Sequence, residues 1–247
     1  MRNMTLNRRK LSLIAVLFVM LCLSPIVWEE TTFALDGADV AIYNDSSAPV
    51  DRVTGAKRSG AWQDGIIAIK CMLHWMGLSH EEISYRDLND PRKDISSLYK
   101  VLLFPGGFAY WYNYWISSLG KNRIRNFVNN GGGYFGICAG AFFASDTVMW
   151  EGISYGDRYL YNAYGEMTGY DLDLFSGTAT GPINGIAPWP TYGMTTIHFE
   201  TESEILSGYK TVPFSEDFFY YGGPYFTLAQ GQNVKVLGNY DYNGEPA

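Results

Sequence analysis

Short apolar segments alternate with helix-like segments along the first part of this chain, and this alternation constrains the fold most. The segments 38–45, 100–107 and 134–138 are typical of buried strands that end in polar or glycine-rich loops. Between them, 61–77 and 121–133 place apolar residues on one face of a helix. Continuous apolar strands separated by helices predict an α/β fold with a mostly parallel sheet and helices on both faces.

The rest of the chain is less regular and is rich in glycine, tyrosine and threonine. Its strand candidates are 194–200, 217–223 and 234–240, and 82–88 is a further candidate in the first part. We expect the later strands to extend the parallel sheet as antiparallel or edge strands. No repeat, low-complexity tract or linker interrupts residues 35–247, which are predicted to form a single domain.

The first 34 residues have the pattern of a targeting segment. A basic start is followed by an apolar run from Leu11 to Trp28, and Ala34 supplies a small residue for cleavage. The run (11–28) is long for a signal peptide, so an uncleaved N-terminal anchor is the alternative. We therefore expect an exported protein (secreted, periplasmic or at the cell surface) that meets a membrane only through this segment, if the segment is retained.

Composition excludes some classes of partner. Without residues 1–34 the chain keeps 14 basic and 23 acidic side chains, a net charge of −9. Such a surface repels phosphate backbones, which argues against nucleic acid as a partner. Cys71 and Cys138 are too few for a disulfide framework. No spacing of Cys, His, Asp or Glu indicates a metal site, and no cofactor is predicted.

Residues 136–140, Gly-Ile-Cys-Ala-Gly, are the cysteine form of the nucleophile-elbow pattern G-x-S-x-G. A nucleophile on a sharp strand-to-helix turn has a strained backbone, which explains the glycines. The start of the following helix would favour the thiolate of Cys138. The N–H of Ala139, with a second donor from the Gly106–Gly107 loop, would face a developing oxyanion. The alternative is an inert core cysteine, because free cysteine is among the most buried residue types.

Three segments carry a resemblance to a known family: VLLFPGG (101–107), IRNFVNNGGGYFGICAGAFFAS (124–145) and FFYYGGPYF (218–226). They resemble the class I glutamine amidotransferase-like superfamily, and within it the N-terminal domain of biotin-protein ligases and its stand-alone relatives. The resemblance implies a flavodoxin-like three-layer sandwich, a Cys-His-Glu triad and amide hydrolysis through a thioester. It implies Cys138 as the nucleophile, with Gly106, Gly107 and Ala139 as the oxyanion region. No biotin-ligase catalytic domain follows here, so ligation of biotin is not implied.

The sequence departs from the superfamily at the catalytic base. The resemblance implies a His-Pro-Glu stretch near the end of the domain, whereas this chain ends in VLGNYDYNGEPA. We expect either a truncated product or a naturally shortened, inactive form. His198 and Glu200 have the spacing of a substitute pair, but their position favours an ordinary strand histidine. The related ThiJ/PfpI group takes its histidine from the position held here by Ala139, which counts against that group.

Two functions therefore stay open. One is an exported, glutamine amidotransferase-like hydrolase that cleaves a small-molecule or peptide-like amide through a thioester at Cys138. The other is a catalytically inactive binding domain that keeps the fold. The aromatic stretch 108–120 is expected either to form a wall over Cys138 or to pack in the core. Nothing in the sequence indicates an oligomeric state.

Overall fold

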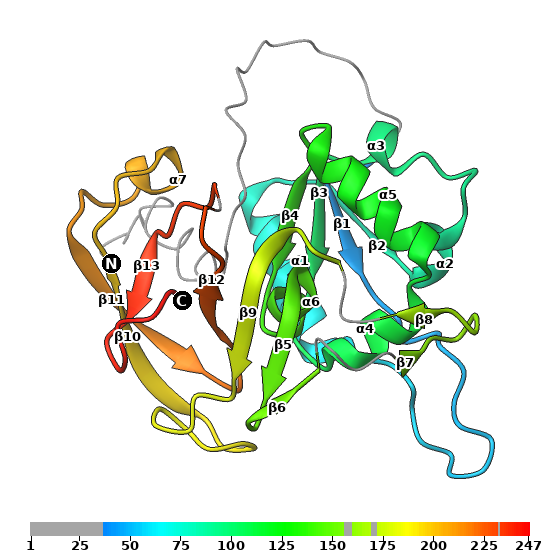
Figure 1. Cartoon of the computed structure of the whole chain (residues 1–247). Helices are drawn as coiled ribbons and strands as arrows, with labels where there is room; N and C mark the ends of the chain where they lie inside the picture. The colour runs from blue at the N-terminus through cyan, green and yellow to red at the C-terminus, as the bar shows by residue number, and fades with distance from the viewer. Residues whose placement is uncertain (1–36, 156–159, 169–171, 232) are drawn as a thin grey trace, which may run out of the picture.

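The computed structural model describes residues 37–155, 160–168, 172–231 and 233–247. Four strands form a parallel sheet in the order β2-β1-β3-β4 (Figure 1). These strands are β1 (Val40–Tyr43), β2 (His80–Ile83), β3 (Val101–Phe104) and β4 (Gly133–Gly136). All four residues of β1 are buried, as a continuous apolar strand inside an α/β sheet requires. The predicted parallel sheet in a mixed α/β fold is confirmed.

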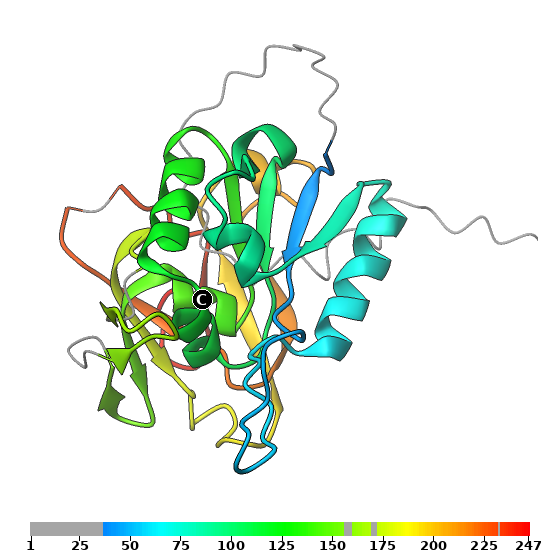
Figure 2. The same ribbon diagram turned by 90° about the vertical axis from the view of Figure 1, so that its right-hand side faces the viewer.

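Six helices connect or follow these strands. They are α1 (Gln63–Met76), α2 (Tyr85–Asn89), α3 (Ile95–Leu98), α4 (Ala109–Trp115), α5 (Ser118–Asn129) and α6 (Ala139–Ala144). The chain passes from β1 to β2 on one side and then returns to β3 and β4 on the other. Because such crossovers are right-handed, α1 covers one face of the sheet and α5 the opposite face (Figures 1 and 2).

The strand predicted at 82–88 is wrong beyond Ile83, where a helix begins instead. The Ser84 hydroxyl accepts the Arg86 N–H at 3.2 Å, and the Asp87 carboxylate accepts the Ser84 N–H at 2.7 Å. This reciprocal capping box satisfies backbone donors at the start of α2 and outweighs the weak strand pattern.

The second half of the chain builds three further sheets. One has the order β12-β9-β5-β6, with β5 (Ser145–Trp150), β6 (Ile153–Ser154), β9 (Phe175–Gly181) and β12 (Tyr225–Leu228). Another is antiparallel, β11-β10-β13, with β10 (Gly193–Phe199), β11 (Phe214–Tyr220) and β13 (Gly238–Tyr240). The third pairs β7 (Leu160–Tyr161) with β8 (Met167–Thr168), and a short helix, α7 (Glu204–Ser207), follows β10.

The expectation that the later strands extend the parallel sheet is therefore wrong. β5 begins at Ser145, directly after the six residues of α6. A crossover to a fifth parallel strand needs a dozen residues or more, so the chain enters another sheet after α6. The candidate at 194–200 forms most of β10 and pairs with β11, which contains the first four residues of the candidate at 217–223.

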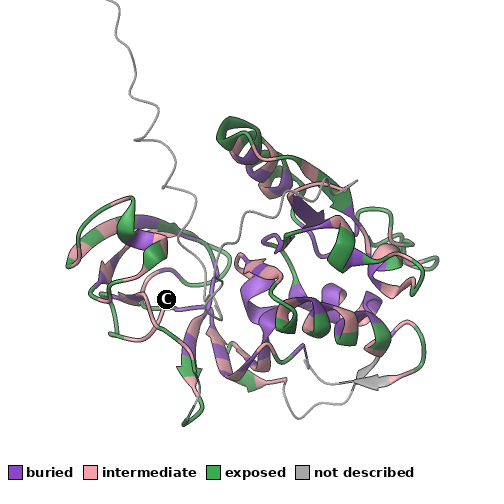
Figure 3. Cartoon of the chain, turned by 90° about the horizontal axis from the view of Figure 1, so that it is seen from above, coloured by how far each residue is buried: buried purple, intermediate pink, exposed green. Residues whose placement is uncertain are grey.

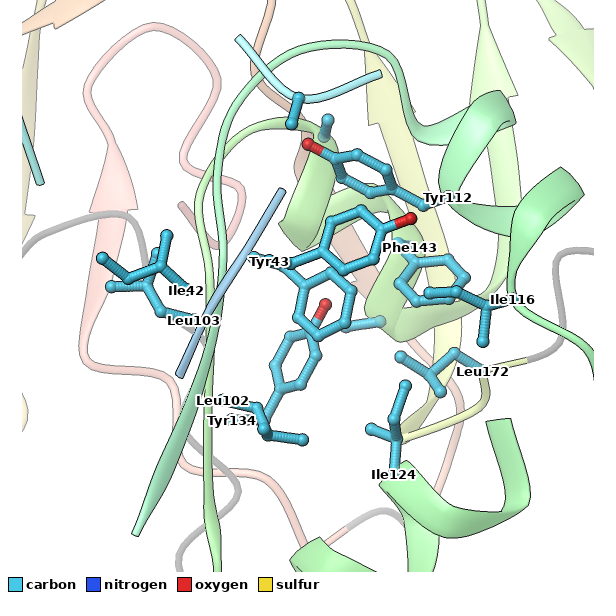
Figure 4. Packing of buried hydrophobic residues seen from close by; sticks show 14 of the residues in the cluster. Ile42, Tyr43, Leu102, Leu103, Tyr112, Ile116, Ile124, Tyr134, Phe143 and Leu172 are labelled. Atoms are coloured by element: carbon cyan, nitrogen blue, oxygen red, sulfur yellow. The ribbon is translucent and has the colours of Figure 1, made fainter. Parts of the chain in front are cut away.

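Among the described residues, the larger hydrophobic cluster joins the parallel sheet to α4, α5, α6 and β9. Its centre is a set of aromatic rings in which Phe104 stacks on Tyr43 and on Tyr134, with ring centroids 4.8 and 5.1 Å apart (Figure 4). Tyr112 of α4 meets Tyr43 edge-on at 4.9 Å. Figure 3 shows buried residues where helices face the sheets and exposed ones on their outer turns. This packing fixes the carboxyl edge of the parallel sheet, where the candidate site lies.

The predicted signal or anchor, residues 1–34, lies outside the described residues. Among the described helices, none combines the length and apolar character that crossing a membrane requires.

Candidate functional site

Cys138 occupies a sharp turn between β4 and α6. Its backbone has φ +49° and ψ −102°, outside the regions that residues with a side chain normally adopt. A Cβ on Gly136 would lie 2.6 Å from the backbone of Gly140, and one on Gly140 would lie 2.3 Å from the carbonyl oxygen of Phe104. The two glycines of the G-x-C-x-G pattern therefore allow the turn to pack tightly against the end of β3.

Four backbone groups surround the sulfur of Cys138. The N–H groups of Gly107 and Ala139 act on the sulfur and favour its thiolate form. On another side, the carbonyl oxygens of Tyr221 and Gly222 lie 3.9 and 4.0 Å from Sγ. The site thus offers two donors and two acceptors around one nucleophilic atom. Three of the four residues expected in this site, Cys138, Gly107 and Ala139, meet directly.

Gly106 and Gly107 play different parts in this arrangement. The N–H of Gly107 lowers the pKa of the Cys138 thiol, whereas the carbonyl of Gly106 accepts the N–H of Trp62 at 2.9 Å. Gly107 has φ +140°, and a Cβ there would lie 1.8 Å from the carbonyl oxygen of Gly60. A side chain is excluded at Gly107, so the glycine is needed to bring this N–H to Cys138.

Asp45 supports the loop that covers these glycines, and sequence reasoning missed it. The side chain is fully buried, and its oxygens accept the N–H groups of Gly60 and Ala61 at 2.8 and 2.9 Å. Burial raises the pKa of Asp45, while these two N–H groups act in the opposite direction. The carbonyl of Gly60 in turn accepts the N–H of Phe108 at 2.9 Å. The only sequence signal was one acidic residue at the end of an apolar strand.

Exposed aromatic rings belong to the segments that contact Cys138. Trp62, Trp189 and Tyr221, here called the aromatic rim, are 51%, 42% and 37% exposed. The Tyr221 ring lies 5.1 Å from the Trp189 ring and 6.5 Å from the Trp62 ring, centroid to centroid. The backbone carbonyl of Tyr221 faces Cys138, which places the rim next to the nucleophile. These residues are far apart in the sequence, so no local pattern could reveal them.

The aromatic stretch 108–120 does not supply this rim. Its Tyr112 is buried, and the hydroxyl donates to the carbonyls of Pro105 and Gly106 at 3.1 and 3.3 Å, below the Gly-Gly loop. Three of its other residues, Tyr110, Trp111 and Tyr114, line a separate cavity of about 310 Å³. The rest of that cavity is lined by Asp51, Thr54, Ala56 and Arg58. The core-packing alternative therefore describes Tyr112, and the aromatic rim comes from other segments.

The three histidines lie away from Cys138, although all of them are in described residues. His80 pairs with Val40 at the amino edge of the parallel sheet, opposite the edge where Cys138 lies. His74 is in the last turn of α1, about 18 Å along the helix from Trp62. His198 pairs with Ser215, six residues or roughly 20 Å of strand before Tyr221.

His198 takes part in a different network. One of its ring nitrogens, Nδ1, lies 2.6 Å from the Ser215 hydroxyl, and Nε2 lies 2.7 Å from the Asp241 carboxylate. The substitute pair considered from the sequence, His198 with Glu200, therefore does not converge on the thiol.

The protonation of Cys138 differs from the sequence-based expectation. Burial raises the pKa of the thiol, and the N–H groups of Gly107 and Ala139 offset only part of this effect. No charged group in the described part of the chain contributes to the pKa of Cys138. The helix dipole was expected to favour the thiolate, but α6 has only six residues and burial prevails.

We therefore expect the alkylation rate of Cys138 by iodoacetamide to rise with an apparent pKa above the roughly 8.5 of a free thiol. Only the thiolate reacts, and its fraction stays small until the pH approaches this raised pKa. The measurement uses a Cys22→Ser/Cys71→Ser variant, because these two other cysteines of the chain would react in parallel. The Cys22→Ser/Cys138→Ser variant, whose remaining thiol is Cys71, supplies the reference curve. An apparent pKa below that of Cys71 would contradict this expectation.

The family model for the N-terminal domain of biotin-protein ligases matches residues 88–246 of this chain. The chain belongs to this family. The match includes the Gly106–Gly107 loop and the Cys138 turn, and it confirms the resemblance to the N-terminal domain of biotin-protein ligases.

Two curated proteins are similar to parts of this family member. An uncharacterized protein of Chlamydia muridarum is 30% identical over 153 residues, which are 60% of this chain and 52% of that protein. The biotin–protein ligase of Schizosaccharomyces pombe is 30% identical over 141 residues, 57% of this chain and 21% of the ligase. The chain thus spans about half of one relative and about a fifth of the other.

Proposed function

We propose that this biotin-protein ligase N-terminal-like domain binds an amide group at Cys138 and cleaves it through a thioester. The arrangement of donors and acceptors around the sulfur is the observation that supports this. An amide has one carbonyl acceptor and, when primary or secondary, an N–H donor. The N–H groups of Gly107 and Ala139 suit the carbonyl oxygen of the amide, and the carbonyls of Tyr221 and Gly222 suit its N–H group. An inert core cysteine would need neither this set nor a strained backbone.

In this reaction the sulfur of Cys138 bonds to the carbonyl carbon and the carbon–nitrogen bond breaks. The amine leaves with the thiol proton, and water then releases the acid and restores the thiol. The two N–H groups stabilise the negative oxygen of the tetrahedral intermediate, and removing one such donor typically costs about 100-fold or more in rate. The positions of the histidines supply no imidazole for the proton transfers, so turnover would be slow.

The second candidate is binding without turnover. It is favoured by the raised pKa of Cys138 and by the distance of every histidine from the thiol. Under this alternative the turn at Cys138 has a structural role only. An amide or another neutral polar group binds reversibly beside the sulfur and is not cleaved.

The proposal also includes the type of fold and the export of the domain. The order β2-β1-β3-β4 is that of the first four strands of a flavodoxin-like sheet, which supports a shortened flavodoxin-like sandwich. Residues 35–247 would act as one exported domain, because the segment 11–28 has the pattern of a signal or anchor.

Incubation with N-acyl p-nitroanilides tests both candidates. If the domain is a hydrolase, nitroaniline release depends on Cys138, is lost in Cys138→Ser and persists in Cys71→Ser. Intact mass after acid quenching then shows an acyl group on Cys138, because deacylation lacks a base and the thioester accumulates. Saturable binding by calorimetry without release or acylation supports the binding domain. If no amide binds and none is cleaved, amide recognition at Cys138 is rejected.

A further inference from the structure

We infer that the Cys138 site takes a neutral amide that carries an apolar ring next to its carbonyl. The amide-binding site is the proposed function on which this rests, and the ring is the new element. The ring would stack on the aromatic rim of Trp62, Trp189 and Tyr221, while the amide occupies the backbone donors and acceptors at the sulfur.

The position of the rim supports this reading. Gly222 has φ +69°, and a Cβ on it would lie 3.0 Å from the ring of Trp189. The carbonyl of the same glycine lies 4.0 Å from the sulfur of Cys138. The ring of Trp189 therefore packs directly against the segment that faces the nucleophile, and a group attached to the bound amide would be within its reach.

The exposure of the rim gives a second reason. Ligand sites are mostly apolar and aromatic, with a few polar groups that fix orientation. The rim rings contact one another, yet each keeps more than a third of its surface accessible. Stacking a ligand ring would cover this apolar surface, and pairs of aromatic rings gain stabilisation beyond the area that they bury.

Charge argues for a neutral ligand. The groups around the sulfur are backbone N–H groups and the backbone carbonyls of Tyr221 and Gly222, all uncharged, so none of them would pair with a carboxylate or an ammonium group. The net charge of −9 in residues 35–247 also opposes the approach of anions. A free amino acid amide such as glutamine carries both charges next to its side chain and would leave them unpaired at this site.

Aldehydes test the inference, because a thiol adds to an aldehyde to form a hemithioacetal. The sulfur–carbon bond forms, the thiol proton ends on the oxygen, and the oxygen occupies the position of the proposed oxyanion. The Cys22→Ser/Cys71→Ser protein is incubated with phenylacetaldehyde, acetaldehyde or succinic semialdehyde, and protection of Cys138 from iodoacetamide is measured. The same aldehydes with N-acetylcysteine correct for intrinsic reactivity.

We expect phenylacetaldehyde to protect at a concentration at least tenfold lower than acetaldehyde after this correction, and succinic semialdehyde to protect no better than acetaldehyde. Trp189→Ala and Tyr221→Ala should each reduce the preference for phenylacetaldehyde by several-fold. Trp75→Ala is the matched control, since Trp75 is 43% exposed but lies near the far end of α1. Circular dichroism melting establishes that each variant is folded.

The outcomes separate the two proposals. If no aldehyde protects Cys138, binding of a carbonyl at this site, and with it the proposed function, is overturned. If acetaldehyde and phenylacetaldehyde protect equally, the carbonyl site stands and the ring-bearing ligand is refuted. Equal protection by succinic semialdehyde and phenylacetaldehyde would refute the preference for a neutral ligand. A preference that survives both rim substitutions would show that the ring binds elsewhere.

Discussion

Replacing Gly140 with alanine is expected to destabilise the fold by about 3 kcal/mol or more. A Cβ at this position would lie 2.3 Å from the carbonyl oxygen of Phe104 and 2.7 Å from its Cβ. The carbonyl belongs to the end of a buried strand and cannot rotate away, so β3 and α6 would have to separate. The carbonyl of Gly140 also accepts the buried hydroxyl of Tyr134 at 2.7 Å, and this hydrogen bond would be strained by the same shift.

Urea unfolding followed by tryptophan fluorescence measures this effect, and the melting temperature should fall by roughly 6–12 °C for a loss of that size. Gly208→Ala is the matched control. Gly208 follows α7 with φ −89°, and a Cβ there would meet no atom within 4 Å. Its substitution should change stability by no more than about 0.5 kcal/mol. Equal losses in the two variants would show that the tight turn at Cys138 does not depend on Gly140.

The part of this fold that is encoded locally could be predicted. The apolar segments at 38–45, 100–107 and 134–138 contain β1, β3 and β4, because a strand buried on both faces needs uninterrupted apolar residues. The G-x-C-x-G pattern gave the turn at Cys138, since only glycine fits where β4, α6 and β3 approach one another.

Features that depend on distant residues could not be predicted. β10 and β11 are recognisable strands, but their pairing with each other in a separate sheet is a contact between segments that no local pattern encodes. The aromatic rim joins residues 62, 189 and 221, whose contacts no sequence period encodes. The direction in which the pKa of Cys138 is shifted could not be predicted either, because burial of the sulfur depends on all the segments that surround it.

Asp45→Ala is the second substitution with a large expected effect, at about 2 kcal/mol or more of stability. The loss follows because the buried N–H groups of Gly60 and Ala61 would have no acceptor. Asp45→Asn should fall between wild type and alanine, since its amide offers one acceptor oxygen in place of two. Asp64→Ala is the control, because Asp64 is exposed in the first turn of α1 and its loss should cost less than about 1 kcal/mol.

The consequence for the site is more specific than the loss of stability. The Asp45 carboxylate accepts the N–H groups of Gly60 and Ala61. The segment that contains them is in turn bonded to the Gly106–Gly107 loop. The Phe108 N–H donates to the carbonyl of Gly60, and the Trp62 N–H donates to the carbonyl of Gly106. Hydrogen exchange at the amide of Gly107 should therefore accelerate in Asp45→Asn under conditions where the protein stays folded. The pKa of Cys138 should rise further as the Gly107 N–H moves away, because that bond favours the thiolate. Faster exchange confined to Gly60 and Ala61, with the Cys138 alkylation profile unchanged, would mean that Asp45 stabilises its own loop and does not position the donor at the nucleophile.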